Sequence, residues 1–204
     1  MAQFHGLPSF SIIINGVAIS GTIEVLGITI VQAAEEADFA IVEIRDIVSS
    51  DLVENFKVSN DSTFEVGNDI QLKLGYDQQN KKVFNGVINR HELSVSSDNF
   101  VVRLYCISQN HDGSEKIRDT KNIKPQNPEP SLVFGESIIA MELTQHNDDN
   151  KLITGTLLTE GSLEFQVYGM VDIECINQRF DGEHLIIGLT HILKDGTWQT
   201  EVAI

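Results

Sequence analysis

One β pattern occurs twice in the chain, and the two copies lie about a hundred residues apart. In each copy a glycine shortly before an Asp-Ile pair opens a strand. A Phe-(Asn/Asp)-Gly turn then ends a short excursion, and a His-x-Leu strand leads to a final alternating strand. The first copy runs from Val66 to Ile107 and the second from Tyr168 to Ile204. Duplication of this kind predicts two related β modules in tandem.

The remaining pattern is almost entirely that of strands. β-branched residues recur at near period two, as a half-buried strand requires, and Gly21–Val31 is rich in them. Only Ser49–Phe56 has the pattern of a helix, with Ser49 or Ser50 placed to cap it. Asp195-Gly196 predicts a hairpin turn, because this pair tolerates positive φ. The other predicted strands are Ser11–Ile14, Val17–Ile19, Phe39–Ile44, Phe64–Leu74, Phe100–Ile107, Ser131–Thr144, Leu152–Leu158, Ser162–Gln166, Asp172–Ile176, His184–His191 and Thr197–Val202.

A change of composition divides the two modules. Three of the four prolines, Pro125, Pro128 and Pro130, fall in a charged stretch with little apolar surface. Such a stretch predicts an extended connector. We therefore expect a mainly β fold in which two tandem, related β-barrel-like domains with one short helix are joined by a Pro-containing linker. The predicted boundaries are 1–108 for the first domain, 109–130 for the linker and 131–204 for the second domain.

The charge balance limits the classes of partner. With 30 acidic and 14 basic residues the net charge is −16, which argues against binding to a nucleic-acid backbone. The acid surplus has two open explanations: it keeps the protein soluble, or it lines a surface past which other polyanions slide without binding. No apolar run approaches the roughly 18 residues of a membrane span, so we expect no stable membrane insertion. The N-terminus lacks the pattern of a signal peptide, which predicts synthesis in the cytoplasm.

The sequence contains no recognisable catalytic or metal-binding motif. The six histidines fall in no compact ligand spacing, and no nucleophile elbow or phosphate-binding glycine loop is present. Asn147–Asn150 lacks the ligand spacing of a calcium loop. Cys106 and Cys175 each lie in a strand pattern and are predicted to be buried, reduced thiols. We therefore expect no enzymatic activity, no cofactor and no metal.

Several motifs, taken in order, resemble the hub (tube-adaptor) domains of contractile injection systems. This family includes the type VI secretion spike protein, the phage late control protein D and the baseplate hub of contractile phage tails. The resemblance covers residues from about 10 to 107 and from about 131 to 204. The positions that carry it are Phe64, Gly67, Ile70, Gly75, Tyr76, Phe84, Gly86, Phe165, Phe180, Gly182, His191, Gly196 and Trp198.

The resemblance implies a structural role. In that family three subunits form a ring of six similar barrels, which adapts a threefold spike to a sixfold tube. It therefore implies a homotrimer with a tube protein and a spike or needle protein as partners. It also implies a location in the bacterial cytoplasm before assembly, and afterwards in the injection apparatus or virion tail. The chain departs from the pattern, since it has only the connector where relatives carry further domains between the barrels.

A second hypothesis belongs to another class of protein. A two-domain β protein could recognise carbohydrate or peptide in a groove around Trp198 and Tyr168. Trp198 is the only tryptophan, and a position in a strand after Asp-Gly is more typical of a core or barrel-end plug than of a sugar platform.

Overall fold

The computed structural model describes residues 6–46, 56–96, 99–109, 116, 130–146 and 152–204, and within them the chain is almost entirely β. The prediction of a mainly β fold is therefore confirmed. One 3-10 turn, η1 (Ser62–Phe64), is the helical element of the described part. No helix there is long and apolar enough to cross a membrane. The strands are β1 (Pro8–Ile14), β2 (Val17–Ala18), β3 (Val25–Ala33), β4 (Phe39–Arg45), β5 (Asp69–Tyr76), β6 (Lys81–Val95), β7 (Phe100–Ile107), β8 (Ser131–Val133), β9 (Ile138–Gln145), β10 (Ile153–Glu160), β11 (Met170–Glu174), β12 (Gly182–Leu185), β13 (Gly188–Lys194) and β14 (Thr197–Ala203).

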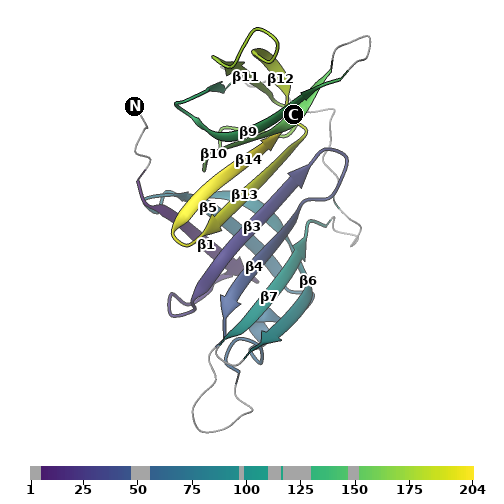
Figure 1. The fold of residues 1–204 in the computed structure, drawn as a ribbon. Helices are drawn as coiled ribbons and strands as arrows, with labels where there is room; N and C mark the ends of the chain where they lie inside the picture. Colours follow the sequence, from purple (N-terminus) through teal and green to yellow (C-terminus); the bar gives the residue numbers. More distant parts are fainter. Residues whose placement is uncertain (1–5, 47–55, 97–98, 110–115, 117–129, 147–151) are drawn as a thin grey trace.

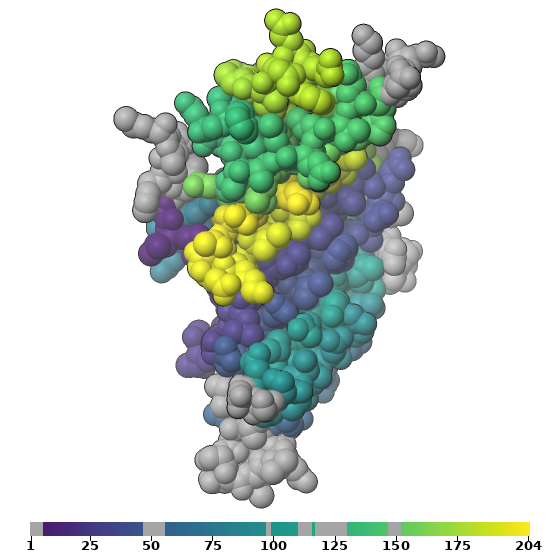
Figure 2. Space-filling model, viewed as in Figure 1, coloured from purple at the N-terminus to yellow at the C-terminus, as the bar shows by residue number. Residues whose placement is uncertain are grey.

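Eleven of these strands form one sheet, in the order β2-β1-β5-β6-β7-β4-β3-β13-β14-β10-β9. The other three form a small sheet, β12-β11-β8. Figure 1 shows the large sheet curling, so that β1 and β5 lie behind β3 and β4, while the small sheet lies at the far end from β6 and β7. In Figure 2 the segments from β8 onward cover one end of the molecule as a continuous mass.

The same neighbour relations occur twice along the chain. In what we call the first module, β1–β7, the order is β1-β5-β6-β7-β4-β3. In the second module, β8–β14, the neighbours run β8-β11-β12 and then β13-β14-β10-β9. The two series match strand for strand if β12 and β13 together correspond to the 15-residue β6. One difference is that β8 pairs with β11 in parallel, whereas β1 pairs with β5 antiparallel.

Local sequence explains the strand ends and faces. Asn15 and Gly16 have φ values of 49° and 79°, and Asp195 and Gly196 have 50° and 73°. Positive φ at both central residues is the geometry of a type I′ turn, which matches the twist of a tight hairpin. Alternating burial along β5 and β14 follows from the period of two in a strand, with one face toward the core.

Two hydrophobic cores stabilise the molecule. The first lies inside the curled first module, where residues of β1 and β3 such as Ile12 and Ile30 belong to the same cluster. Leu193 and Trp198 of the second module also belong to this cluster. The second core gathers apolar residues of the second module, including Leu157 and Val202, which are fully buried. The modules therefore share both a sheet and part of a core.

Several details of the sequence prediction are wrong. Phe84-Asn85-Gly86 is not a turn but lies inside β6, where Gly86 comes so close to Ile107 O that an added Cβ would overlap it. The predicted strand Phe64–Leu74 begins only at Asp69, because η1 and a turn at Gly67 come first. Ser162–Gln166 forms no strand.

The region between β11 and β14 also differs from the prediction. The single strand expected at His184–His191 is divided into β12 and β13, which lie in different sheets. Residues 49–55 of the expected helix, and residues 110–115 and 117–129 of the expected linker, lie outside the described residues. The domain boundaries 1–108, 109–130 and 131–204 stay a prediction.

Candidate assembly surface

The two modules join through one strand pair. β3 and β13 lie antiparallel over seven residue pairs, from Gly27 opposite Lys194 to Ala33 opposite Gly188. At the centre of this pair His191 lies opposite Ile30, and both side chains are buried. The His191 ring nitrogen Nδ1 lies 3.0 Å from Thr200 Oγ1. Burial disfavours the charged imidazolium and lowers the pKa of His191 to about 4, so its imidazole is neutral at physiological pH.

Trp198 plugs the junction next to His191. Its side chain is only 4% exposed and packs against Tyr76, with ring centroids 5.0 Å apart. Gly161 N–H donates to Trp198 O at 2.9 Å, and Tyr76 Oη donates to Gly161 O at 3.0 Å. The pKa of Tyr76 is raised, first because the ring is partly buried and second because Glu160 is negatively charged. Burial of the indole agrees with a core plug and leaves no open ring face for a sugar.

The groove proposed around Trp198 and Tyr168 is not formed. Trp198 belongs to the first core, whereas Tyr168 packs against the second. Tyr168 Oη accepts a hydrogen bond from Glu35 N at 3.0 Å, which ties it to the turn after β3. The two aromatic side chains therefore serve different cores.

The predicted motif positions are mostly core or turn positions. Apolar ones are buried in the two cores, and glycines lie where positive φ or a close backbone approach excludes a side chain. The structure brings Tyr76, His191 and Trp198 together at the junction. The buried apolar positions are Phe64, Ile70, Phe84 and Phe165; the positive-φ glycines are Gly67, Gly182 and Gly196; the closely approached glycines are Gly75 and Gly86; and Phe180, in a turn, is half-buried.

Strand β9 forms an open edge of the large sheet. Gly155 of β10 exchanges backbone hydrogen bonds with Ile204, at 3.0 and 3.1 Å. The backbone groups of odd-numbered β10 residues therefore point toward β14, and those of even-numbered residues point toward β9. By the register of β9 and β10, Met141, Leu143 and Gln145 then direct their N–H and C=O groups away from the sheet. No described backbone group bonds to them.

The second half of β6 is also open on one side. Asp46 N–H donates to Phe100 O and Ser108 N–H donates to Asp38 O. Because alternate residues of a strand bond to opposite neighbours, the backbone groups of even-numbered β7 residues point toward β4 and those of odd-numbered residues point toward β6. Their partners in β6 are Arg90, Glu92 and Ser94. His91, Leu93 and Val95 therefore point their backbone groups to the opposite side, which β5 does not reach because its pairing with β6 ends at Val87. No described backbone group bonds to these three residues.

Charged side chains line the outer face beside the β6 edge. Arg103 forms ion pairs with Glu43 at 2.8 Å and with Glu92 at 3.3 Å, across β4, β7 and β6. The guanidinium of Arg90 lies over the ring of Tyr105, 3.7 Å from its centroid, and its side chain is 59% exposed. The stacking holds Arg90 flat on the sheet, and its Nη2 lies 3.9 Å from Glu92 Oε2 in a long, exposed ion pair.

The other edges are short or blocked. β2 has two residues, and the free part of β1 begins with Pro8, which has no N–H. On β8, the Val133 N–H donates to Ser137 Oγ at 2.8 Å, and Val133 O accepts from the N–H groups of Glu136 and Ser137. Blocking of this kind is how soluble proteins prevent unwanted strand addition, so the open β9 and β6 edges are exceptions.

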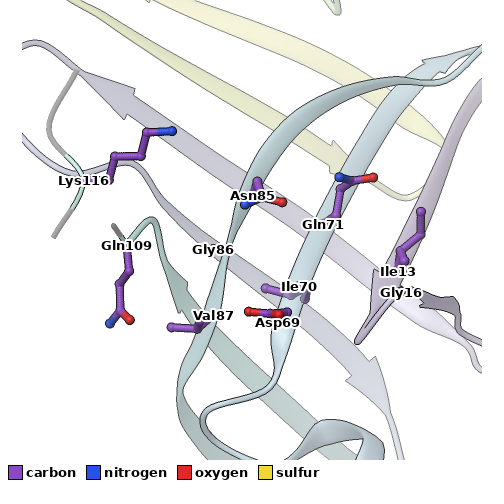
Figure 3. Close-up of a pocket in the computed structure, with 10 residues that line it drawn as sticks. All are labelled: Ile13, Gly16, Asp69, Ile70, Gln71, Asn85, Gly86, Val87, Gln109 and Lys116. Atoms are coloured by element: carbon purple, nitrogen blue, oxygen red, sulfur yellow. The ribbon is translucent and has the colours of Figure 1, made fainter. Parts of the chain in front are cut away.

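A polar pocket of about 830 Å³ lies on the outer face of β1, β5 and β6 (Figure 3). Gln71 and Asn85, which are cross-strand partners, lie on its floor, and Asp69 and Lys116 also line it. Its lining has no aromatic side chain on which a sugar could stack. We therefore regard it as a solvated outer face of the first module.

The cysteines and histidines form no reactive site in the described part of the chain. Cys106 is buried, and desolvation raises the pKa of its thiol to about 12. Cys175 is exposed, in contrast to the prediction, because it follows β11 in a turn with a φ of 66°. No group of three or more His, Cys, Asp or Glu side chains among the described residues could hold a metal ion.

In the comparison with protein families, residues 5–114 match the model described as the Alg8 N-terminal domain. This range covers more than half of the chain. The chain belongs to the Alg8 N-terminal domain family. The matched range contains all seven strands of the first module. No curated protein sequence matches the chain.

Solved structures with the fold of this Alg8 N-terminal domain family member include two tail proteins. The 43 kDa tail protein of prophage MuSo2 from Shewanella oneidensis has a TM-score of 0.67 at 9% identity, with 95% of each chain covered. A tail protein from Neisseria meningitidis MC58 has a TM-score of 0.64 at 10% identity, covering 98% of this chain and 96% of that one.

A third similar structure comes from a secretion system. It is the Escherichia coli c3393 protein, described as a component of the type VI secretion system with structural similarity to the T4 bacteriophage tail proteins gp27 and gp5. The TM-score is 0.59 at 10% identity, covering 94% of this chain and 75% of that one. At these identities the three likenesses show a shared fold.

Proposed function

We propose that the protein is a non-enzymatic structural hub of a contractile injection apparatus, of the type VI secretion or phage-tail kind. Three copies form a pseudo-sixfold ring that joins a tube protein to a spike or needle protein. The observation that carries this proposal is the repeated strand order, because one chain with two related modules supplies six modules in a trimer. The shared fold with a prophage tail protein, a second tail protein and a type VI secretion component supports the same role.

The geometry suits assembly better than catalysis. The described residues hold no metal-binding cluster, and His191 is sealed in the junction between the modules, where burial lowers its pKa to about 4. Two strand edges, by contrast, have backbone groups to which no other group in the described part of the chain bonds. The alternative of a carbohydrate- or peptide-binding module has less support, because Trp198 is buried.

Light scattering behind a sizing column tests the proposal. A trimer has a mass of about three times 22.6 kDa. Electron microscopy of the same sample is expected to show a ring with six similar lobes. A single-chain mass at high concentration, together with failure to co-assemble with a tube protein of the same apparatus, would refute the hub role. A glycan-array signal that Trp198→Ala removes would favour the binding module instead.

A further inference from the structure

The contact between the two modules of one chain provides a template for a contact between copies. Matching the modules by strand order makes β9 the counterpart of β3, and the second half of β6 the counterpart of β13. Within the chain β3 pairs with β13. Their counterparts, β9 and the second half of β6, are the two edges on which no described group completes the backbone hydrogen bonds.

We propose that β9 of one copy pairs antiparallel with residues 89–95 of β6 in a neighbouring copy, in the register that β3 and β13 use within the chain. The occupant of the β9 edge is thus a second copy of this chain. The contact is head-to-tail, since each copy offers one edge of each kind, and such a contact closes into a ring if the rotation fits. This inference rests on the proposed ring and names the strands that close it.

The register follows from three strand pairs. The repeated His-x-Leu pattern makes His91 and His191 counterparts, and we therefore also match the residues opposite them, Leu104 and Thr200. Following the pairing from β7 to β4 and β3, and from β14 to β10 and β9, makes Met141 the counterpart of Ile30.

Since His191 lies opposite Ile30, Met141 is placed opposite His91 of the neighbouring copy. The backbone directions agree with this register. Met141 and His91 both direct their N–H and C=O groups toward the open side of their strands. They therefore form a hydrogen-bonded pair. The side chains of both are half-buried and continue the inner face of the sheet.

Charge complementarity supports the same register. One residue along from the central pair, Glu142 is placed opposite Arg90 of the neighbouring copy. Glu142 is exposed and has no ion-pair partner in the described part of the chain. Arg90 is held over Tyr105, its side chain is 59% exposed, and its ion pair within the chain, to Glu92, is a long one of 3.9 Å. A shift by one residue would lose this pair and turn the apolar faces apart.

Exposed apolar side chains flank both edges. Ile139 in β9 is 54% exposed, and Leu93 and Val95 in β6 are 36% and 57% exposed. In the proposed register Ile139 and Leu93 fall at the same level of the joined sheet. Their burial adds a hydrophobic contribution to the backbone hydrogen bonds of the new strand pair.

Charge reversal tests the register. Arg90→Glu and Glu142→Arg each place like charges opposite one another, which is expected to weaken association about a hundredfold. The double variant Arg90→Glu/Glu142→Arg restores the opposite charges and the wild-type mass. In a mixture of the two single variants every contact between unlike chains pairs opposite charges, so association is expected to return, whereas a closed ring of three keeps one contact between like chains and is expected to stay weaker than the wild-type ring. Glu201→Arg is the matched control, because Glu201 is exposed on β14, inside the sheet, and its reversal should leave the mass unchanged.

Disulfide trapping separates this contact from the ring itself. Positions 90 and 142 form a non-hydrogen-bonded pair, where side chains approach closely enough for a disulfide. In a Cys175→Ser background, Arg90→Cys and Glu142→Cys chains are each expected to stay uncrosslinked when oxidised alone and to give a covalent dimer when mixed.

The possible outcomes are distinct. A trimer that neither crosslinks nor responds to charge reversal would overturn the strand pair and leave the ring. Crosslinked chains that form open filaments would support the strand pair and reject the ring. A protein that stays monomeric and forms no crosslink would overturn both. Circular dichroism of each variant confirms that the β fold is retained.

Discussion

Lowering the pH is expected to destabilise the protein through His191. The imidazole is buried at the β3–β13 pair, and desolvation lowers its pKa from the ordinary value of 6.5 to about 4. In the unfolded chain it binds a proton below about pH 6.5, whereas in the native state it stays neutral until about pH 4. Between these values the unfolded state binds more protons, so stability falls as the pH falls. Each pKa unit corresponds to about 1.36 kcal/mol, which gives a loss of about 3 kcal/mol from His191.

Urea unfolding at pH 7, 6, 5 and 4 measures this loss. The fluorescence of Trp198 is a suitable signal, because it is the only tryptophan and its ring centroid lies 6.0 Å from that of His191. His191→Gln is the control, since an amide can still hydrogen-bond to Thr200 Oγ1 and does not titrate. The wild-type protein should lose about 3 kcal/mol more than the variant between pH 7 and 4. Equal losses in both proteins would show that His191 is not buried in a neutral state.

Two further predictions test the junction and the thiols. Gly161→Ala places a methyl group against the Trp198 indole and is expected to cost about 1–3 kcal/mol in unfolding free energy; Gly21→Ala, at a site with open space, should cost little by comparison. A thiol reagent should label Cys175 rapidly in the native protein and Cys106 only after unfolding, because Cys175 is exposed whereas Cys106 is buried and its thiol pKa is raised to about 12. Mass spectrometry measures the rate of labelling at each cysteine. Equally fast labelling of the two would contradict the burial of Cys106.

The sequence predicted the class of fold because alternation is a local signal. β4 and β7 follow the period of two closely, and their predicted bounds differ from the observed ones by a residue or less. The turns at Asn15-Gly16 and Asp195-Gly196 were also predictable, since positive φ at both positions favours these residues.

The prediction was wrong where the same residue type or pattern occurs in two different structural settings. Asn85-Gly86 has the composition of a hairpin turn, yet here the glycine allows β6 to approach Ile107 closely in mid-strand. Cys175 lies at the end of an apolar alternation, but the strand ends one residue earlier and the side chain points to solvent. Neither outcome can be derived from neighbours in sequence, because both depend on where a distant strand lies.

The candidate assembly surface was beyond the reach of the sequence for the same reason. Arg90 and Glu142 belong to no motif, and they become notable only when the register shows that they flank two open edges. The motif positions that carried the resemblance, such as Phe64 and Gly67, instead maintain the core and turns of each module.

The β3–β13 pair has a consequence for how the chain folds. Ile30 and His191 meet across about 160 residues of sequence, and closing so long a loop costs chain entropy before any contact compensates for it. The first module can form its sheet from nearer segments, whereas β13 needs β3 already in place to complete its hydrogen bonds. Residues 131–204 made alone would expose the edge of β13, so we expect that fragment to aggregate and the full chain to fold slowly, with the first module leading.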